Sequence, residues 1–127
     1  MPVIKVWCLP ETSETKLNEL YNEIVKALRT VEELGIKNSN GITCLFPTDM
    51  MKFGIGKEII VEVTGLFDKP ERTEKVRQEL AEKLGQVVAG SFPDIDLIEV
   101  FVYPFNPNQV FLLQENLILI LIEPFVK

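Results

Sequence analysis

The first half of the chain has the apolar pattern of a strand, an amphipathic helix and a second strand. Residues 2–8 are mainly β-branched or aromatic, which predicts a strand. Thr12 or Ser13 can cap a helix that ends before Gly35. The apolar positions of this helix recur at steps of three and four: Leu17, Leu20, Tyr21, Ile24, Leu28 and Val31. After a turn-rich segment, residues 42–46 predict the second strand.

The second half repeats this order of elements. Residues 58–64 and 97–103 predict two more strands. Between them, Asp68 offers an N-cap with Glu71 three residues on, and Gly90 offers an end to the helix. The apolar stripe of this helix consists of Val76, Leu80, Leu84 and Val87 or Val88.

The repeated order predicts a single α+β domain of residues 1–127, in which two β-α-β units form a four-stranded sheet. Each helix lets its flanking strands run parallel through a right-handed crossover, so both helices are expected on one face of the sheet. The same pattern also fits an ordinary split ferredoxin-like sandwich.

The two faces of the predicted sheet differ in polarity. The face toward the helices is aliphatic and consists of Pro2, Ile4, Val6, Ile98, Val100 and Val102. The opposite face mixes charged and aromatic side chains: Lys5, Trp7, Glu62, Glu99, Phe101 and Tyr103. Large apolar groups on it would contact water in a monomer, so the pattern predicts oligomerisation. A solvated amphipathic face is the alternative.

Composition and charge narrow the possible partners and chemistry. A chain of 127 residues, 46% of them apolar, can bury one core, and a net charge of -6 argues against nucleic acid or an anionic membrane as the main partner. The chain has no histidine, which excludes His-based triads and His-based metal sites, and we expect no metal. Cys8 and Cys44 lie in apolar runs and are expected to stay reduced. Residues 1–9 lack the pattern of a signal peptide, so we expect a cytoplasmic protein.

Pro2 is the candidate catalytic residue. Methionine before a small residue is normally removed, which would leave the pyrrolidine nitrogen of Pro2 as a secondary amine. A terminal amine titrates near pH 8, and burial against an aliphatic core lowers its pKa because burial disfavours the ammonium form. Such an amine can act as a general base that moves a proton next to a carbonyl. The alternative is that Pro2 merely starts a strand.

The order of these features resembles the tautomerase superfamily, which includes 4-oxalocrotonate tautomerase, 5-carboxymethyl-2-hydroxymuconate isomerase and macrophage migration inhibitory factor (MIF). The resemblance rests on Pro2 at the start of a strand, the helix and strand that follow, and Phe53-Gly-Ile-Gly56 before the next strand. It implies a tautomerase/MIF-like fold, a homotrimer, and a cofactor-independent keto-enol tautomerase or isomerase with a small carbonyl or enol substrate.

The resemblance also implies substrate-binding residues. Lys37 would hold a carboxylate, Phe53 would form an aromatic wall, and Glu99 and Phe101 would come from a neighbouring subunit. Three of these residues have a simpler interpretation. Lys37 fits an ordinary loop lysine, Phe53 fits a packing residue, and Glu99 fits a solvated or Lys5-paired carboxylate. The arginines by which 4-oxalocrotonate tautomerase holds a dicarboxylate fall near Thr12 and Thr43, so a doubly charged substrate is not expected. A non-catalytic trimeric binding protein with the same fold is the alternative function.

Residues 110–127 are the most apolar part of the chain. The run from Leu117 to Ile122 is too short to cross a membrane, which needs about 20 apolar residues. We therefore predict an extra C-terminal strand, which the resemblance places at the subunit interface. A peripheral membrane contact is the alternative.

Overall fold

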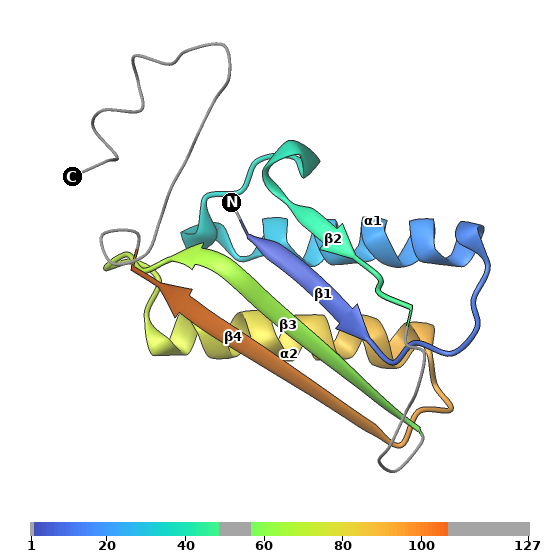
Figure 1. Cartoon of the computed structure of the whole chain (residues 1–127). Coiled ribbons are helices and arrows are strands. Elements are labelled where there is room, and N and C mark those ends of the chain that lie inside the picture. The colour runs from blue at the N-terminus through green and yellow to red at the C-terminus, as the bar shows by residue number, and fades with distance from the viewer. Residues whose placement is uncertain (1, 49–56, 107–127) are drawn as a thin grey trace.

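The computed structural model describes residues 2–48 and 57–106, and within them it contains two strand-helix-strand units (Figure 1). The first unit consists of β1 (Val3–Trp7), α1 (Glu14–Thr30), the short 3₁₀ turns η1 (Glu32–Leu34) and η2 (Ser39–Gly41), and β2 (Thr43–Leu45). The second consists of β3 (Glu58–Phe67), α2 (Glu74–Ser91) and β4 (Leu97–Phe105). Phe53 and the predicted C-terminal strand in residues 110–127 lie outside the described residues.

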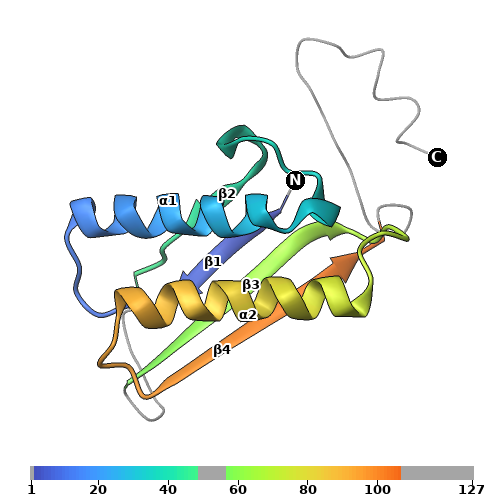
Figure 2. The ribbon, with the colours of Figure 1, turned by 180° about the vertical axis from the view of Figure 1, so that it is seen from behind.

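The strands form one sheet in the order β2-β1-β3-β4. β1 pairs with β2 and β3 with β4 in parallel, whereas the central pair β1–β3 is antiparallel. Both helices cover the same face, as Figure 2 shows from behind. The predicted α+β fold class is therefore confirmed. The split arrangement is excluded, because the two strands of each unit are direct neighbours and no other strand lies between them.

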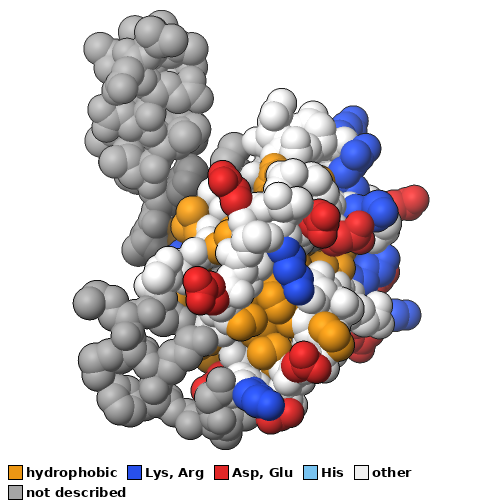
Figure 3. Space-filling model, turned by 90° about the vertical axis from the view of Figure 1, so that its right-hand side faces the viewer, with side chains coloured by type: hydrophobic (Ala, Val, Ile, Leu, Met, Phe, Trp, Pro, Cys, Tyr) orange, Lys and Arg blue, Asp and Glu red, His pale blue; other side chains and the backbone are white. Residues whose placement is uncertain are grey.

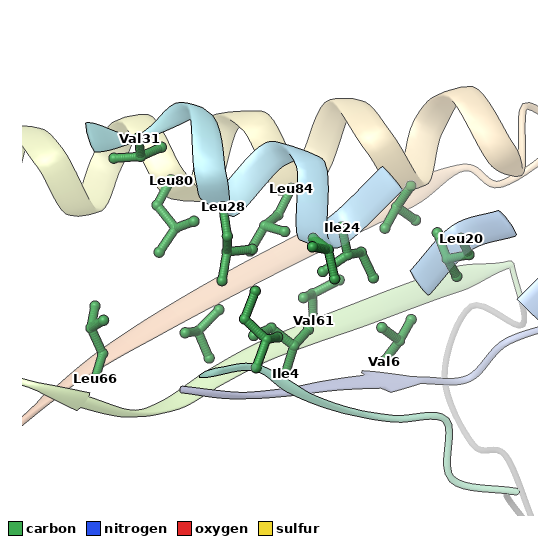
Figure 4. Packing of buried hydrophobic residues seen from close by; sticks show 14 of the residues in the cluster. Ile4, Val6, Leu20, Ile24, Leu28, Val31, Val61, Leu66, Leu80 and Leu84 are labelled. Atoms are coloured by element: carbon green, nitrogen blue, oxygen red, sulfur yellow. The ribbon is translucent and has the colours of Figure 1, made fainter. Parts of the chain in front are cut away.

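The hydrophobic core lies between this sheet face and the two helices (Figure 4). Ile4 and Val61 from the sheet and Ile24, Leu28 and Leu84 from the helices are 0% exposed. Each fully buried aliphatic side chain of this kind contributes about 1.5–3 kcal/mol. The aliphatic alternation predicted for the strands is thus what attaches both helices to the sheet.

The start of the helix agrees with the sequence for α1 and differs for α2. Ser13 caps α1, since its Oγ accepts a hydrogen bond from the amide of Lys16 at 3.2 Å. The N-cap of α2 is Thr73, so the prediction of Asp68 was wrong. The reason is that β3 and β4 remain paired up to Phe67 and Phe105, and the amide of Asp68 donates to the carbonyl of Phe105 at 2.7 Å.

Gly90 does not end α2, which continues to Ser91 with Phe92 as its C-cap. In the first unit, α1 ends at Thr30, and Gly35 follows η1 with a φ of 69°. Glycine adopts this left-handed conformation without the steric penalty that a side chain brings. The predicted stop signal therefore ends the short 3₁₀ turn and not the helix itself.

The face of the sheet away from the helices is the open face. Four large apolar residues on it are well exposed: Leu45 at 44%, Leu97 at 39%, Phe101 at 40% and Tyr103 at 46%. The register of the strands places them on the same face as Lys5 and Glu62. Leu45 lies on β2 and the other three on β4, so the exposed apolar groups lie on the two outer strands.

Candidate functional site

Pro2 is buried at the start of β1. Its carbonyl accepts a hydrogen bond from the amide of Thr43 at 3.1 Å, which fixes it beside the first residue of β2. By the alternation of the strand, Pro2 faces the helix layer together with Ile4, which is 0% exposed. Pro2 therefore lies at the end of the sheet, in register with the face of β1 that carries the aliphatic core.

On the other side of Pro2, β3 is irregular. Val3 pairs with Thr64, and the pairing of β3 with β4 shifts between Val63 and Leu66. Gly65 lies in this interval with a φ of 72°, a conformation that favours glycine. The strand next to Pro2 is thus bent by a β-bulge, a feature that often re-aims strands beside functional sites.

Lys37 lies in the loop between η1 and η2, and its side chain is exposed. This loop leads into β2, whose first residue, Thr43, binds Pro2. The loop that contains Lys37 therefore enters the sheet at the end where β1 begins, close to the N-terminus in Figure 1. Phe53, the predicted aromatic wall, lies outside the described residues.

Glu99 and Phe101 do not meet Pro2 within one chain. Glu99 pairs with Ile60, which in turn pairs with Trp7, five residues along β1 from Pro2. At about 3.3 Å per residue this is a separation of roughly 16 Å along the strand. In addition, Glu99 lies on β4, and β3 separates β4 from β1. Glu99 and Phe101 also belong to the open face, whereas Pro2 faces the helices.

The open face contains polar and aromatic contacts that the sequence did not reveal. The Nε1 of Trp7 donates a hydrogen bond to the Oε1 of Glu62 at 2.5 Å. The rings of Phe101 and Tyr103 stack with centroids 6.2 Å apart. Strand alternation predicted that these residues share a face, but alternation does not specify which of several neighbours a carboxylate will bind.

Cys44 is a thiol close to Pro2 in the sheet, because it follows Thr43 on β2. Burial raises the pKa of the Cys44 thiol from 9.0 to about 11, since desolvation disfavours the thiolate. The thiol is therefore protonated near neutral pH, and it is a poor nucleophile. Within residues 2–48 and 57–106, no group of three or more Cys, Asp or Glu side chains could hold a metal ion.

The opposite end of the sheet carries a separate hollow of about 420 Å³. Its apolar lining includes Pro10, Phe92 and Ile95, and hydrophobic side chains gather among charged ones on this side of the molecule (Figure 3). The ammonium of Lys16 lies 4.5 Å from the centre of the Phe92 ring, a cation–π contact. Thr12 is also here, with its hydroxyl bound to the carbonyl of Pro10 at 2.6 Å.

In the part of the chain that the structure describes, no helix is long and apolar enough to span a bilayer.

Comparison of the sequence with family models and with curated proteins finds no match. Solved structures do match. Native Ps01740 has a TM-score of 0.66 and 16% identity and covers 86% of this chain and 98% of its own. Native fused 4-OT has a TM-score of 0.64 and 13% identity, with coverage of 85% and 90%. The MIF-like protein of Entamoeba histolytica has a TM-score of 0.61 and 16% identity, with coverage of 85% and 91%. These neighbours agree with the resemblance to the tautomerase superfamily, and the chain has the tautomerase/MIF-like fold.

Proposed function

We propose that this protein is a cofactor-independent keto-enol tautomerase or isomerase that uses the amine of Pro2 as its general base. The observation that carries the proposal is the buried position of Pro2 just before β1, on the strand face that packs against the helices. The fold supports it, because structural neighbours include a fused 4-OT and a MIF-like protein. We further propose that the protein acts in the cytoplasm.

The proposed reaction moves one proton. The lone pair of the Pro2 nitrogen takes a proton from the carbon next to a carbonyl, and the resulting enolate receives the proton at another position. Burial lowers the pKa of the amine below its ordinary value of about 8, so that more of it is unprotonated at neutral pH. General base catalysis of this kind contributes about 10²- to 10⁴-fold to the rate.

We propose that the functional unit is a homotrimer with its sites between subunits. Several fused 4-OT structures among the neighbours are described as trimers. The exposed Leu45 on one outer strand, and Leu97, Phe101 and Tyr103 on the other, would be covered if outer strands of neighbouring subunits approached one another. Glu99 and Phe101, which are remote from Pro2 in their own chain, would then complete the site of a neighbour.

The proposed substrate is a small carbonyl acid with at most one carboxylate near the reacting carbon. Lys37 is the basic residue that we assign to this carboxylate. Thr12 lies at the far end of the sheet, where its hydroxyl binds Pro10, and Thr43 is a neutral residue beside Pro2. Neither position therefore offers the bidentate charge that recognises a second carboxylate.

The test combines intact mass with a rate measurement. We expect Met1 to be absent from the purified protein, because an amide nitrogen at Pro2 would not be basic. We expect Pro2→Ala to lower the ketonisation rate of an enolpyruvate-type substrate by about 10²- to 10⁴-fold. Pro93→Ala is the matched control, since Pro93 is exposed and lies outside the site. Retention of Met1, or equal rates for wild type and Pro2→Ala, would contradict the mechanism.

A non-catalytic trimeric binding protein is the second candidate, and the neutral residues at Thr12 and Thr43 favour it. The pKa of the Pro2 amine distinguishes the two functions. An NMR titration that gives a pKa well below 8 supports the enzyme, whereas an ordinary value of about 8 supports the binding protein.

A further inference from the structure

Asn40, which is exposed, and Gly41 form an asparagine–glycine step in η2, one residue before β2. The turn has three residues, and the side chain of Asn38 caps it by accepting a hydrogen bond from the amide of Asn40 at 2.9 Å. The main-chain hydrogen bond from Gly41 to the carbonyl of Asn38 is long, at 3.5 Å. The amide nitrogen of Gly41 is thus held only weakly.

We propose that Asn40 is a site of spontaneous deamidation in the folded protein. The amide nitrogen of Gly41 attacks the Cγ of Asn40, an N–Cγ bond forms, and the Cγ–Nδ2 bond breaks. The amide proton of Gly41 leaves with the departing nitrogen as ammonia, and a five-membered succinimide remains. Water then opens the ring at either carbonyl and gives aspartate or isoaspartate. The reaction needs no other reactant than water, and it replaces a neutral side chain by a carboxylate.

Three features of the local structure favour this reaction. A Cβ on Gly41 would have no heavy atom within 4 Å apart from its chain neighbours, so Gly41 is not packed against another element on that side. Glycine also gives the attacking nitrogen the widest range of backbone conformations. Opening a single 3₁₀ turn breaks few hydrogen bonds, whereas Asn18 and Asn22 lie within the hydrogen-bonded helix α1.

A carboxylate at position 40 would also affect Pro2, and this part of the inference rests on the proposed function, in which Pro2 is the base. Asn40 precedes Thr43 by three residues, which places their Cα atoms within about 11 Å of each other. The amide of Thr43 binds the carbonyl of Pro2 at 3.1 Å. A carboxylate at position 40 would favour the ammonium form of the Pro2 amine and so raise its pKa. Deamidation would therefore lower the fraction of active base near neutral pH.

The experiment is peptide mapping by mass spectrometry of the folded wild-type protein during incubation at neutral and mildly alkaline pH. We expect Asn40 to deamidate at least about tenfold faster than Asn38, which lies in the same loop but is followed by Ser39, because a side chain after the asparagine restricts the attack. Gly41→Ala is the matched variant. It should slow the reaction at Asn40 and leave the fold intact, because Gly41 has no positive φ and open space around it.

Two results would overturn the site itself: an equal rate at Asn38 and Asn40, or an unchanged rate in Gly41→Ala. Asn40→Asp tests the consequence separately, with an expected upward shift of the Pro2 amine pKa in an NMR titration. If deamidation occurs but the Asn40→Asp amine titrates as in wild type, the modification site stands and its link to Pro2 is refuted. Because the mapping does not measure activity, failure of the proposed tautomerase function would leave the result on Asn40 unaffected.

Discussion

Arg72 joins three segments at the end of the fold where Pro2 lies, and its replacement gives the sharpest test of the packing. Its Nη1 donates to the carbonyl of Phe67 at 2.8 Å, and its Nη2 donates to the carbonyl of Leu34 at 2.9 Å. The carbonyl of Arg72 accepts a hydrogen bond from Arg77 at 2.7 Å. The guanidinium thus links η1 of the first unit to the end of β3 in the second.

The expected cost of Arg72→Met follows from these two side-chain hydrogen bonds. A hydrogen bond from a charged group contributes a net 1.5–3 kcal/mol or so to stability. Two such bonds would give about 3–6 kcal/mol, but the buried Nε of Arg72 has no partner among the described residues, which offsets part of the gain. Methionine keeps much of the aliphatic stem, so we expect a loss of about 2–4 kcal/mol in the free energy of unfolding.

Urea denaturation measures this loss, at the same protomer concentration for each variant because assembly would stabilise the folded chain. Arg29→Met is the control, because Arg29 is an exposed residue in the last turn of α1 and its loss should cost less than about 1 kcal/mol. If Arg72→Met lost no more stability than Arg29→Met, the hydrogen bonds of Arg72 between the two units would contribute nothing to the free energy of unfolding.

Three further predictions concern the core, a helix cap and a thiol. Leu84→Ala should lower the free energy of unfolding by about 2–5 kcal/mol in the same assay, because Leu84 is 0% exposed and its removal leaves a cavity. Ser13→Ala should cost about 1 kcal/mol through the lost cap of α1, and Ser39→Ala, which removes no cap, should cost less. Cys44 should react slowly with iodoacetamide at pH 9 in the folded protein and quickly in denaturant. Because the pKa of Cys44 is raised from 9.0 to about 11 in the folded protein, the contribution of this thiol to stability is fully present below about pH 9 and is lost as the pH rises to about 11. Cys44→Ala should therefore flatten the pH–stability curve between these two values. Equal alkylation rates in both states would refute the raised pKa.

The strands and the helix faces could be predicted because alternation and the 3.6-residue period follow directly from the burial of Ile4, Val6, Leu80 and similar positions. The start of α2 could not. Asp68 with Glu71 three residues later has the pattern of a capping box, but the pairing of β3 with β4 extends as far as Phe67 and uses the amide of Asp68. A contact between strands far apart in sequence thus decided a boundary that local pattern assigned elsewhere.

For the candidate site, the burial of Pro2 could be predicted from the sequence, but the residues around it could not. The buried position of Pro2 follows from the alternation of β1. Whether Glu99 and Phe101 belong to the same site depends on a register across three strands, which places them away from Pro2 in one chain. The bond from Trp7 to Glu62 was also not predictable, because Lys5 lies directly opposite Glu62 and offers an equally plausible partner.

In the order β2-β1-β3-β4, the first strand of each unit lies at the centre of the sheet and the second strand lies at an edge. Because the central strands β1 and β3 are antiparallel, an approximate two-fold axis between them relates the two units. The residue that corresponds to Pro2 is Lys57, and its carbonyl accepts hydrogen bonds from Asp96 and Leu97 at the start of β4, as the carbonyl of Pro2 does from Thr43. The nitrogen of Lys57 is an ordinary peptide amide inside the chain, so it has no lone pair available to accept a proton. In the proposed homotrimer, the strand ends at Pro2 and Lys57 would therefore be similar in position, but only the Pro2 ends could hold a base. Substitutions at Lys57 would leave the proposed chemistry at Pro2 unaffected.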